Sequence, residues 1–300
     1  MTLVVRFEEL GAGDVERVGG KCANLGELTG AGFPVPPGFA VTTAAPAAAA
    51  GELAAAVADA YRALGEPPVA VRSSAVAEDG AEASFAGVQD TYLWRRGVDE
   101  VLDAVRRCWS SLGNPEAVAY RAERGIAETR MAVAVQAMVD ARVAGVAFTR
   151  NPVSGDPATV AIDASWGLGV SVVGGEVTPD SFLVNKITGA VVRSRVGAKE
   201  TECLPDPAGG GTATVAVDDE RRSLPCLEPE ELAALVDMAR RVERHYGCHQ
   251  DVEWAIDRAT GELRLLQARP ETVWARRPAA PAPAGAMAAL TATFTGGLRR

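Results

Sequence analysis

The sequence contains no long hydrophobic run. None of its apolar segments reaches the roughly 18 residues that a helix needs to cross a bilayer. The first apolar stretch already carries Arg6, Glu8 and Glu9, unlike a secretion signal. The Ala-rich run from 44 to 60 is interrupted by proline, glycine and acidic residues, which suits a soluble helix. We therefore expect a cytoplasmic protein that is neither secreted nor inserted into a membrane.

Cysteine and histidine are also scarce. The five cysteines are scattered, odd in number and never spaced as C-x-x-C, which fits a reducing cytosol. The only histidines, His245 and His249, are four residues apart, as in a helical metal pair. Gly247 lies between them and should end the helix, so we do not expect them to share a metal ion.

Positive charge is in deficit. The chain has 39 acidic and 30 basic residues, a formal net charge of -9. This balance argues against a wide surface for nucleic acid or anionic lipid, although it is compatible with a local basic pocket for a phosphate ligand. With 300 residues and 48% hydrophobic composition, the chain can bury a core as one large domain or as two lobes.

A polar pattern lies near the C-terminus, on two strand-like segments separated by a glycine-containing turn. Side chains alternate along antiparallel strands, so Asp251 and Glu253 share one face of the first segment. Gln267 and Arg269 likewise share one face of the second. A single register can bring all four side chains together.

The chemistry of these four side chains suits a metal ion and a phosphate. Carboxylate and amide oxygens are the hard ligands that Mg²⁺ prefers, and a guanidinium beside them can hold a phosphate oxygen. An isolated D-x-E pair nevertheless more often belongs to an exposed ribbon with solvated charges, so other parts of the chain must decide. The intervening apolar residues should face the core: Trp254, Ile256, Leu266 and Ala268.

Gly19–Lys21 precedes a helical pattern at residues 22–29. It is not a Walker A loop, because position 15 is not glycine and Cys22 replaces the Ser or Thr of that motif. Such a triplet is more often a simple turn. Backbone N–H groups at a helix start, together with Lys21, are still suited to an anion.

Two further signals leave alternatives open. Arg72 ends a buried strand predicted at 69–72, and its side chain either lies on the surface or points into a cleft. The stretch Ala83–Gly87 is either a simple turn or a small-residue lid whose amides cover phosphate groups, with Gly87 allowing close approach.

Gln136, Met138 and Val139 belong to an apolar run that begins at Met131. We expect this run to form a hairpin with residues 145–148. Alternatively, a strand that leads into a connector can offer its backbone edges to an adenine.

The rest of the chain supplies the framework. Residues 203–227 should be irregular and exposed, and the glycines at 166–169 and 174–175 indicate loops close to a ligand. Helices are predicted at 98–112, 115–124 and 229–246, and strands at 39–42, 91–94 and 182–186. We expect one domain at 1–275, followed by a Pro/Ala-rich linker or tail at 276–300.

These signals occur in one order, and in that order they resemble the N-terminal ATP-binding domain of phosphoenolpyruvate synthase, pyruvate phosphate dikinase and rifampicin phosphotransferase. The resemblance covers residues 1 to about 275 and implies an α+β ATP-grasp fold, in which nucleotide lies between two lobes. The segments that carry it are 19–26, 32–39, 71–75, 84–87, 148–152, 166–169, 251–256 and 267–272.

The resemblance also implies roles for individual residues, with ATP and Mg²⁺ as the cofactors. The implied catalytic residues are Lys21, Arg72, Asp251 and Arg269, and the implied metal ligands are Glu253, Gln267 and Asp251. The implied nucleotide-binding residues are Lys21, Arg72, Gly87, Gln136, Met138, Val139, Glu253, Gln267 and Arg269. Phosphoryl transfer depends mainly on such positioning and charge stabilisation.

Two departures from the family pattern limit this assignment. The family commonly has a glutamate after Trp-Gly-Leu-Gly, and this chain has Val170. Family members also pass phosphate to a histidine on a swivelling domain, and neither His245 nor His249 has that sequence context. We therefore expect an enzyme subunit that phosphorylates a histidine on a separate partner, with release of AMP and phosphate, while the partner binds the final small-molecule acceptor. The alternatives are an ATP-binding regulatory module and a direct small-molecule kinase.

Overall fold

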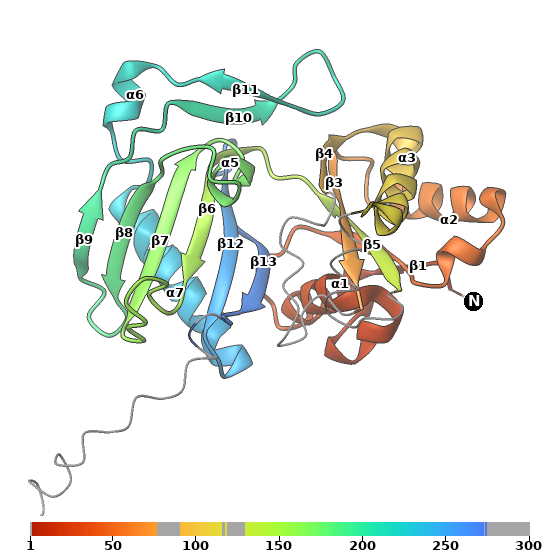
Figure 1. The fold of residues 1–300 in the computed structure, drawn as a ribbon, viewed down its shortest axis with the longest axis horizontal. Helices are drawn as coiled ribbons and strands as arrows, with labels where there is room; N and C mark the ends of the chain where they lie inside the picture. Colours follow the sequence, from red (N-terminus) through yellow and green to blue (C-terminus); the bar gives the residue numbers. More distant parts are fainter. Residues whose placement is uncertain (1, 77–90, 116–117, 119–129, 273, 275–300) are drawn as a thin grey trace, which may run out of the picture.

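The structure is a computed structural model that describes residues 2–76, 91–115, 118, 130–272 and 274. These residues form two lobes, each built on an antiparallel sheet with helices packed against it (Figure 1). The predicted α+β fold with two lobes is confirmed. Three predicted features lie wholly or largely outside the described residues: the stretch Ala83–Gly87, the helix 115–124, and the tail 276–300.

The N-terminal lobe has three layers around a sheet of order β1-β2-β5-β3-β4. Strand residues alternate between two apolar clusters, so Val41 faces α2 and α3 while its neighbour Ala40 faces α1. The elements are β1 (Val4–Arg6), α1 (Val15–Gly30), β2 (Gly38–Val41), α2 (Ala50–Ala63), β3 (Val69–Ala75), β4 (Thr91–Arg95), α3 (Gly97–Ser110) and β5 (Met131–Ala137), with 3-10 turns at Phe7–Glu9, Ala12–Asp14, Ala45–Ala47 and Ser111–Gly113.

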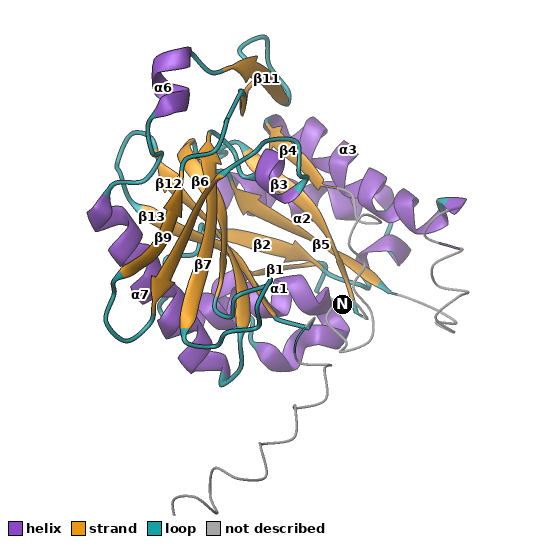
Figure 2. Cartoon of the chain, turned by 60° about the vertical axis from the view of Figure 1, so that its left-hand side comes forward, coloured by secondary structure: helices purple, strands orange, loops and turns teal. Residues whose placement is uncertain are grey.

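The C-terminal lobe is built on a sheet of order β13-β12-β6-β7-β8-β9, and α7 covers one of its faces. Trp254 of β12 is fully buried under that helix. The elements are β6 (Ala141–Phe148), β7 (Thr159–Trp166), α5 (Val170–Val173), β8 (Asp180–Asn185), β9 (Val191–Arg195), β10 (Thr201–Pro205), β11 (Thr212–Ala216), α6 (Asp219–Ser223), α7 (Pro229–Tyr246), β12 (Gln250–Asp257) and β13 (Leu263–Pro270). Both views show α6 and the β10–β11 hairpin beyond one end of this sheet (Figures 1 and 2).

Helix α7 has the predicted bounds, and its ends explain why. Pro229 occupies the first turn, and the Glu228 N–H donates to Glu231 Oε2 over 2.9 Å, closing a capping box. Gly247 ends the helix at φ 66°, a left-handed conformation that glycine adopts without steric cost. None of the helices in the described residues combines the length and hydrophobicity that crossing a membrane requires.

The predicted hairpin between residues 131–139 and 145–148 is wrong. β5 pairs with β2 and β3 in the N-terminal sheet, whereas β6 pairs with β7 and β12 in the other sheet. The three residues Met138–Asp140 therefore connect the lobes. Two adjacent apolar runs suggested local pairing, but each found partners distant in sequence.

Three smaller predictions also need correction. Arg72 does not end its strand, because β3 continues to Ala75 along β5. Residues 203–227 are not wholly irregular, since they hold most of the β10–β11 hairpin together with α6. Leu266 does not join Trp254 in the core: a bulge between Glu253 and Trp254 gives that place to Leu265, and Leu266 turns to the opposite face.

Candidate functional site

A cavity of about 530 Å³ lies between the two lobes. Its walls come from both sheets and from the connector, so residues far apart in sequence meet there. Most of the lining is apolar, as is common for a small-molecule site with a few placed polar groups. The lining residues that the argument uses are Arg72, Thr91, Leu93, Gln136, Met138, Val139, Leu168, Val170, Val173, Glu253, Leu266 and Arg269.

The β12–β13 hairpin has the register that the sequence predicts. Asp251 pairs with Arg269, and Glu253 pairs with Gln267, so all four side chains share one face. They line a second cavity of about 300 Å³ beside the first. Glu253 and Arg269 line both cavities, so the polar cluster stands at their junction.

The oxygens of this cluster fit a cation. Asp251 Oδ1 and Gln267 Oε1 are buried and have no hydrogen-bond partner among the described residues. Buried acceptors without donors are costly unless a ligand satisfies them. The described residues contain no group of three His, Cys, Asp or Glu side chains placed to hold a metal ion, so the candidate set is two carboxylates and one amide.

Burial governs the protonation of Asp251. It raises the pKa of this carboxyl from 3.8 to about 6, and the charges of Glu271 and Glu253 act in the same direction. Arg269 opposes the rise, its Nε donating to Asp251 Oδ2 over 3.3 Å. A bound cation would favour the ionised form in the same way as Arg269 does.

Arg72 points into the cleft, which resolves the alternative left open by the sequence. Its Nη2 donates to Glu253 Oε2 over 3.2 Å, an ion pair that joins the two lobes. The Arg72 Nε is buried and has no partner among the described residues. One arginine thus contacts a candidate metal ligand and keeps a further donor inside the cleft.

Lys21 is held beside this arginine by a hydrogen bond to the main chain of β3. Its side chain is buried, and its Nζ donates to the backbone carbonyl of Ser73, the neighbour of Arg72, over 2.7 Å. Lys21 is not among the residues that line either cavity.

The α1 helix reaches this position through a kink. Gly19 has φ 74°, and a Cβ there would lie 2.1 Å from the Ser74 carbonyl oxygen. Close contact holds the kink, since the Cys22 N–H donates to Ser74 Oγ and that hydroxyl donates to the Val18 carbonyl. Gly19 therefore allows the close approach of α1 to β3, a role that the sequence did not reveal.

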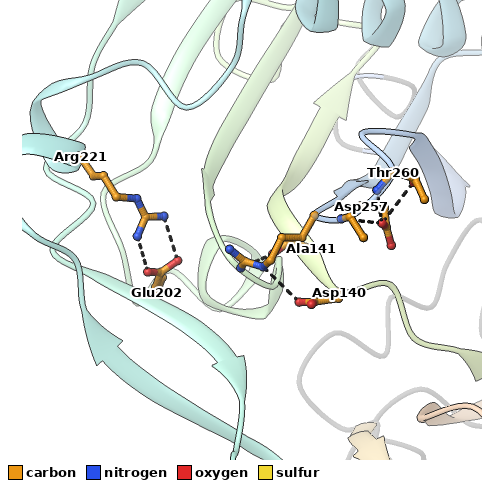
Figure 3. Close-up of polar contacts among 8 residues, drawn as sticks. Asp140, Ala141, Glu202, Arg221, Asp257 and Thr260 are labelled. Atoms are coloured by element: carbon orange, nitrogen blue, oxygen red, sulfur yellow. Dashed lines mark hydrogen bonds and ion pairs between the residues drawn. The ribbon is translucent and has the colours of Figure 1, made fainter.

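The connector forms the other end of the larger cavity. Met138 and Val139 line it beside Gln136, whose side chain is 3% exposed and whose Nε2 has no partner among the described residues. The end of β12 holds the connector: the Arg258 N–H donates to the Asp140 carbonyl over 2.7 Å, and Arg258 Nη2 donates to the Ala141 carbonyl over 3.0 Å. Arg258 Nε also donates to Asp140 Oδ1 over 3.4 Å, and Figure 3 labels both acceptor residues, Asp140 and Ala141.

The structure adds residues that sequence reasoning missed. Thr91, at the start of β4, pairs with Arg72 and lines the larger cavity. Asp163 of β7 lines the smaller one. Val170 lies on α5, and with Val173 it gives the larger cavity an apolar wall. Thr91 and Asp163 are recognised as cavity residues from the pairing of their strands. No local sequence pattern could have predicted that pairing. Gly87 lies outside the described residues.

A further cavity of about 690 Å³ lies between α7 and the β8–β9 edge. It contains none of the predicted site residues, and its walls are mainly apolar. The chemistry therefore points to the interlobe cavity as the candidate site.

The chain is similar to a known protein family over most of its length. A family model described as "Pyruvate phosphate dikinase, AMP/ATP-binding domain" matches residues 15–50 and 47–289. A probable phosphoenolpyruvate synthase of Methanothermobacter thermautotrophicus is 41% identical over 90% of this chain and 46% of its own length. One of Staphylothermus marinus is 38% identical over 91% of this chain and 42% of its own length. The chain thus spans less than half of these relatives.

Other similar proteins are more varied. The prodigiosin synthesizing transferase PigC of Serratia marcescens is 39% identical over 92% of this chain and 34% of its own length. Among solved structures, a dinucleotide-forming acetyl-coenzyme A synthetase of Ca. Korarchaeum cryptofilum has a TM-score of 0.40 at 11% identity, covering 72% of this chain and 81% of that one. A D-alanyl-alanine synthetase A of Vibrio cholerae has a TM-score of 0.35 at 11% identity, covering 81% and 52%. The match to the family model confirms the resemblance that the sequence predicted.

Proposed function

Because the chain belongs to the pyruvate phosphate dikinase AMP/ATP-binding domain family, we propose that it binds Mg-ATP between its lobes and starts a phosphoryl transfer. The phosphate acceptor in this proposal is a histidine on a separate partner protein, and AMP and phosphate are released. The partner binds the small molecule that finally receives the phosphoryl group.

One observation carries the proposal: the Arg72–Glu253 ion pair lies where the apolar cavity meets the polar cluster of β12 and β13. A nucleotide that crosses this junction has its base against the connector and its phosphates beside Arg72 and Arg269. No other cavity described here combines an apolar end with this cluster of charges.

Each residue of the cluster has a task in the proposal. Glu253, Gln267 and Asp251 would hold Mg²⁺, which neutralises charge on the phosphate oxygens. Arg72 and Arg269 bind phosphate oxygens and stabilise charge that moves during transfer. Lys21 joins them if its ammonium group turns away from the Ser73 carbonyl.

The base end uses weaker, directional contacts. Gln136 offers the larger cavity an amide N–H group that has no partner in the described part of the chain, and Met138 and Val139 offer the connector backbone. Gly87 is proposed to cover the phosphates, as the resemblance implies. Val170 and Val173, which are exposed at the wall of the larger cavity, would pack against the bound nucleotide.

The described histidines do not supply the acceptor. His245 Nε2 lies 3.0 Å from Glu27 Oε1, and His249 Nδ1 lies 2.6 Å from Glu243 Oε1. Neither histidine lines the interlobe cavities. This supports an acceptor histidine that lies outside the two lobes.

The test incubates the purified chain with Mg²⁺ and β-labelled ATP, with and without extract of its source cells. We expect AMP and acid-labile label on a second polypeptide. Glu253→Gln should abolish both, whereas Glu262→Gln, a control on the exposed turn of the same hairpin, should not. ATP binding without AMP or label, in extract shown to contain a competent carrier, would favour a regulatory module. ATP-dependent modification of a small molecule by the chain alone would favour a direct kinase.

A further inference from the structure

A bulge in β4 changes the direction of one tryptophan. The pairing of β4 with β3 shifts between Tyr92 and Arg95, so Leu93 and Trp94 together occupy the place of one residue. Regular alternation would return Trp94 to the side of Tyr92, which packs on the core of the N-terminal lobe. Leu93 lines the interlobe cavity, and Trp94 packs behind that cavity instead.

Trp94 belongs to a cluster that is otherwise made by the connector and the C-terminal lobe. Its side chain is 6% exposed. Among the described residues, it is the one member contributed by the N-terminal lobe. The other buried members are Val139, Ala141, Ala144, Leu168, Cys203 and Ala255, of which all except Cys203 line the larger cavity.

The backbone of Trp94 is strained. Its φ is 57°, a region that bulky residues rarely adopt. Such strain persists only when the surrounding packing holds it, and it concentrates at functional sites. Here the positive φ directs the indole into the interlobe cluster. The packing that maintains this strained backbone therefore also joins the two lobes.

The next residue makes a second contact between the lobes. Arg95 Nη1 donates to the carbonyl of Gly210, at the tip of the β10–β11 hairpin, over 3.4 Å. The root of that hairpin belongs to the same cluster, since the Leu168 N–H donates to the Cys203 carbonyl over 2.8 Å. Figure 1 shows the hairpin reaching from the C-terminal lobe toward β4 and α3.

The hairpin is itself fixed to the C-terminal lobe. Arg221 of α6 makes two hydrogen bonds to Glu202 of β10, at 2.7 and 3.2 Å (Figure 3). The same guanidinium lies over the ring of Trp166, 4.7 Å from its centroid. The hairpin is therefore anchored in one lobe while its tip contacts the other.

We propose that Trp94 is a positioning residue for the nucleotide. With Arg95 it forms a latch that holds the N-terminal sheet against the apolar cluster and the hairpin, and so fixes the width of the cavity near the connector. The latch slows release of the bound nucleotide, because the lobes must separate before the base can leave. This inference rests on the proposed ATP site.

The test measures how fast ATP leaves the full-length protein. A fluorescent ATP analogue is bound and then displaced by excess ATP in a stopped-flow instrument. Trp94→Leu should raise the dissociation rate by about tenfold, the equivalent of about 1.4 kcal/mol. Trp94→Phe, which keeps an aromatic ring in the cluster, should have a dissociation rate close to that of the wild type. Arg95→Met should raise the rate in the same direction by a smaller factor.

A matched control separates the latch from general packing. Trp109 packs on the core of the N-terminal lobe, and its Nε1 donates to the Met131 carbonyl over 3.1 Å. Trp109→Leu should lower the unfolding midpoint and leave the dissociation rate unchanged. An equal rise in both tryptophan variants, or no rise in Trp94→Leu, would overturn the latch.

Two further outcomes are decisive. If Trp94→Leu does not fold, two other variants take its place: Arg95→Met, and a variant in which Asn-Gly replaces residues 206–211 of the hairpin. An unchanged ATP dissociation rate in both variants would overturn the proposal. If the wild-type chain does not bind the ATP analogue, the proposed function fails and this inference fails with it. Binding by the wild type with unchanged release in the variants overturns the latch alone.

Discussion

Asp251 and Arg269 lie opposite each other on β12 and β13, with Arg269 Nε 3.3 Å from Asp251 Oδ2. Despite this partner, burial raises the pKa of Asp251 from 3.8 to about 6. The folded-state pKa is above the unfolded value, so ionisation weakens the folded state. This destabilisation grows as the pH rises from about 4 through about 6, and it is fully present above that range.

Asp251→Asn should therefore stabilise the metal-free protein at about pH 8, by at most about 3 kcal/mol for a two-unit shift. The gain should vanish below about pH 4, where the wild-type carboxyl is also neutral. Urea unfolding in a chelator at both pH values measures the difference. Mg²⁺ with ATP should stabilise the wild type more than the variant, and a variant less stable than the wild type at the higher pH would contradict the argument.

The kink of α1 gives a second prediction. Gly19→Ala places a Cβ 2.1 Å from the Ser74 carbonyl oxygen and forces a positive φ on alanine. We expect a loss of about 2–4 kcal/mol in unfolding free energy, from backbone strain and displacement of α1 from β3. Gly13→Ala is the control, because a Cβ there meets nothing within 4 Å. Equal urea midpoints for the two variants would contradict the close approach.

The sequence predicted the shared polar face of β12 and β13, because the information for it is local. Strand alternation alone puts Asp251 with Glu253 and Gln267 with Arg269 on shared faces. The same rule failed at Leu266, where a bulge shifts the register by one residue. A bulge is set by packing across strands, so its position cannot be inferred from the period of two.

The arrangement of the lobes was beyond local reasoning. β5 and β6 follow each other closely, and the apolar pattern favoured a hairpin, yet their partners come from β2, β3, β7 and β12. The connector at residues 138–140 and the role of Thr91 in the cavity depend on those distant pairings. Trp94 was predicted as part of a strand, but its direction depends on the β4 bulge.

The buried pair of Lys199 and Asp180 gives a third prediction. Both side chains are fully buried, and Asp180 also accepts hydrogen bonds from the N–H groups of Gly197 and Cys226, each at 2.7 Å. Lys199→Met leaves a buried carboxylate without its cation, which should cost about 3–5 kcal/mol of unfolding free energy. Lys186→Met, at a partly exposed pair with Glu243, should cost less. Urea unfolding measures both variants, and equal losses of unfolding free energy in Lys199→Met and Lys186→Met would contradict this prediction.

Arg72 gives the last prediction, because its ion pair with Glu253 joins the lobes at the junction of the two cavities. A guanidinium there can bind a phosphate oxygen while it orients a metal ligand. Arg72→Met should therefore weaken ATP binding by about 10- to 100-fold, the equivalent of about 1.5–3 kcal/mol for a charged hydrogen bond. Isothermal titration calorimetry with Mg-ATP measures the change.

Two further variants decide whether geometry or charge is responsible. Arg72→Lys keeps the charge but loses the planar fork of donors, so its affinity should lie between those of wild type and Arg72→Met. Arg62→Met, which breaks an exposed pair with Asp59, should bind ATP as the wild type does. If Arg72→Met also bound ATP with wild-type affinity, the phosphates would have to lie away from the interlobe ion pair. The assignment of the phosphate end of the cavity would then be wrong, even if the base still lay against the connector.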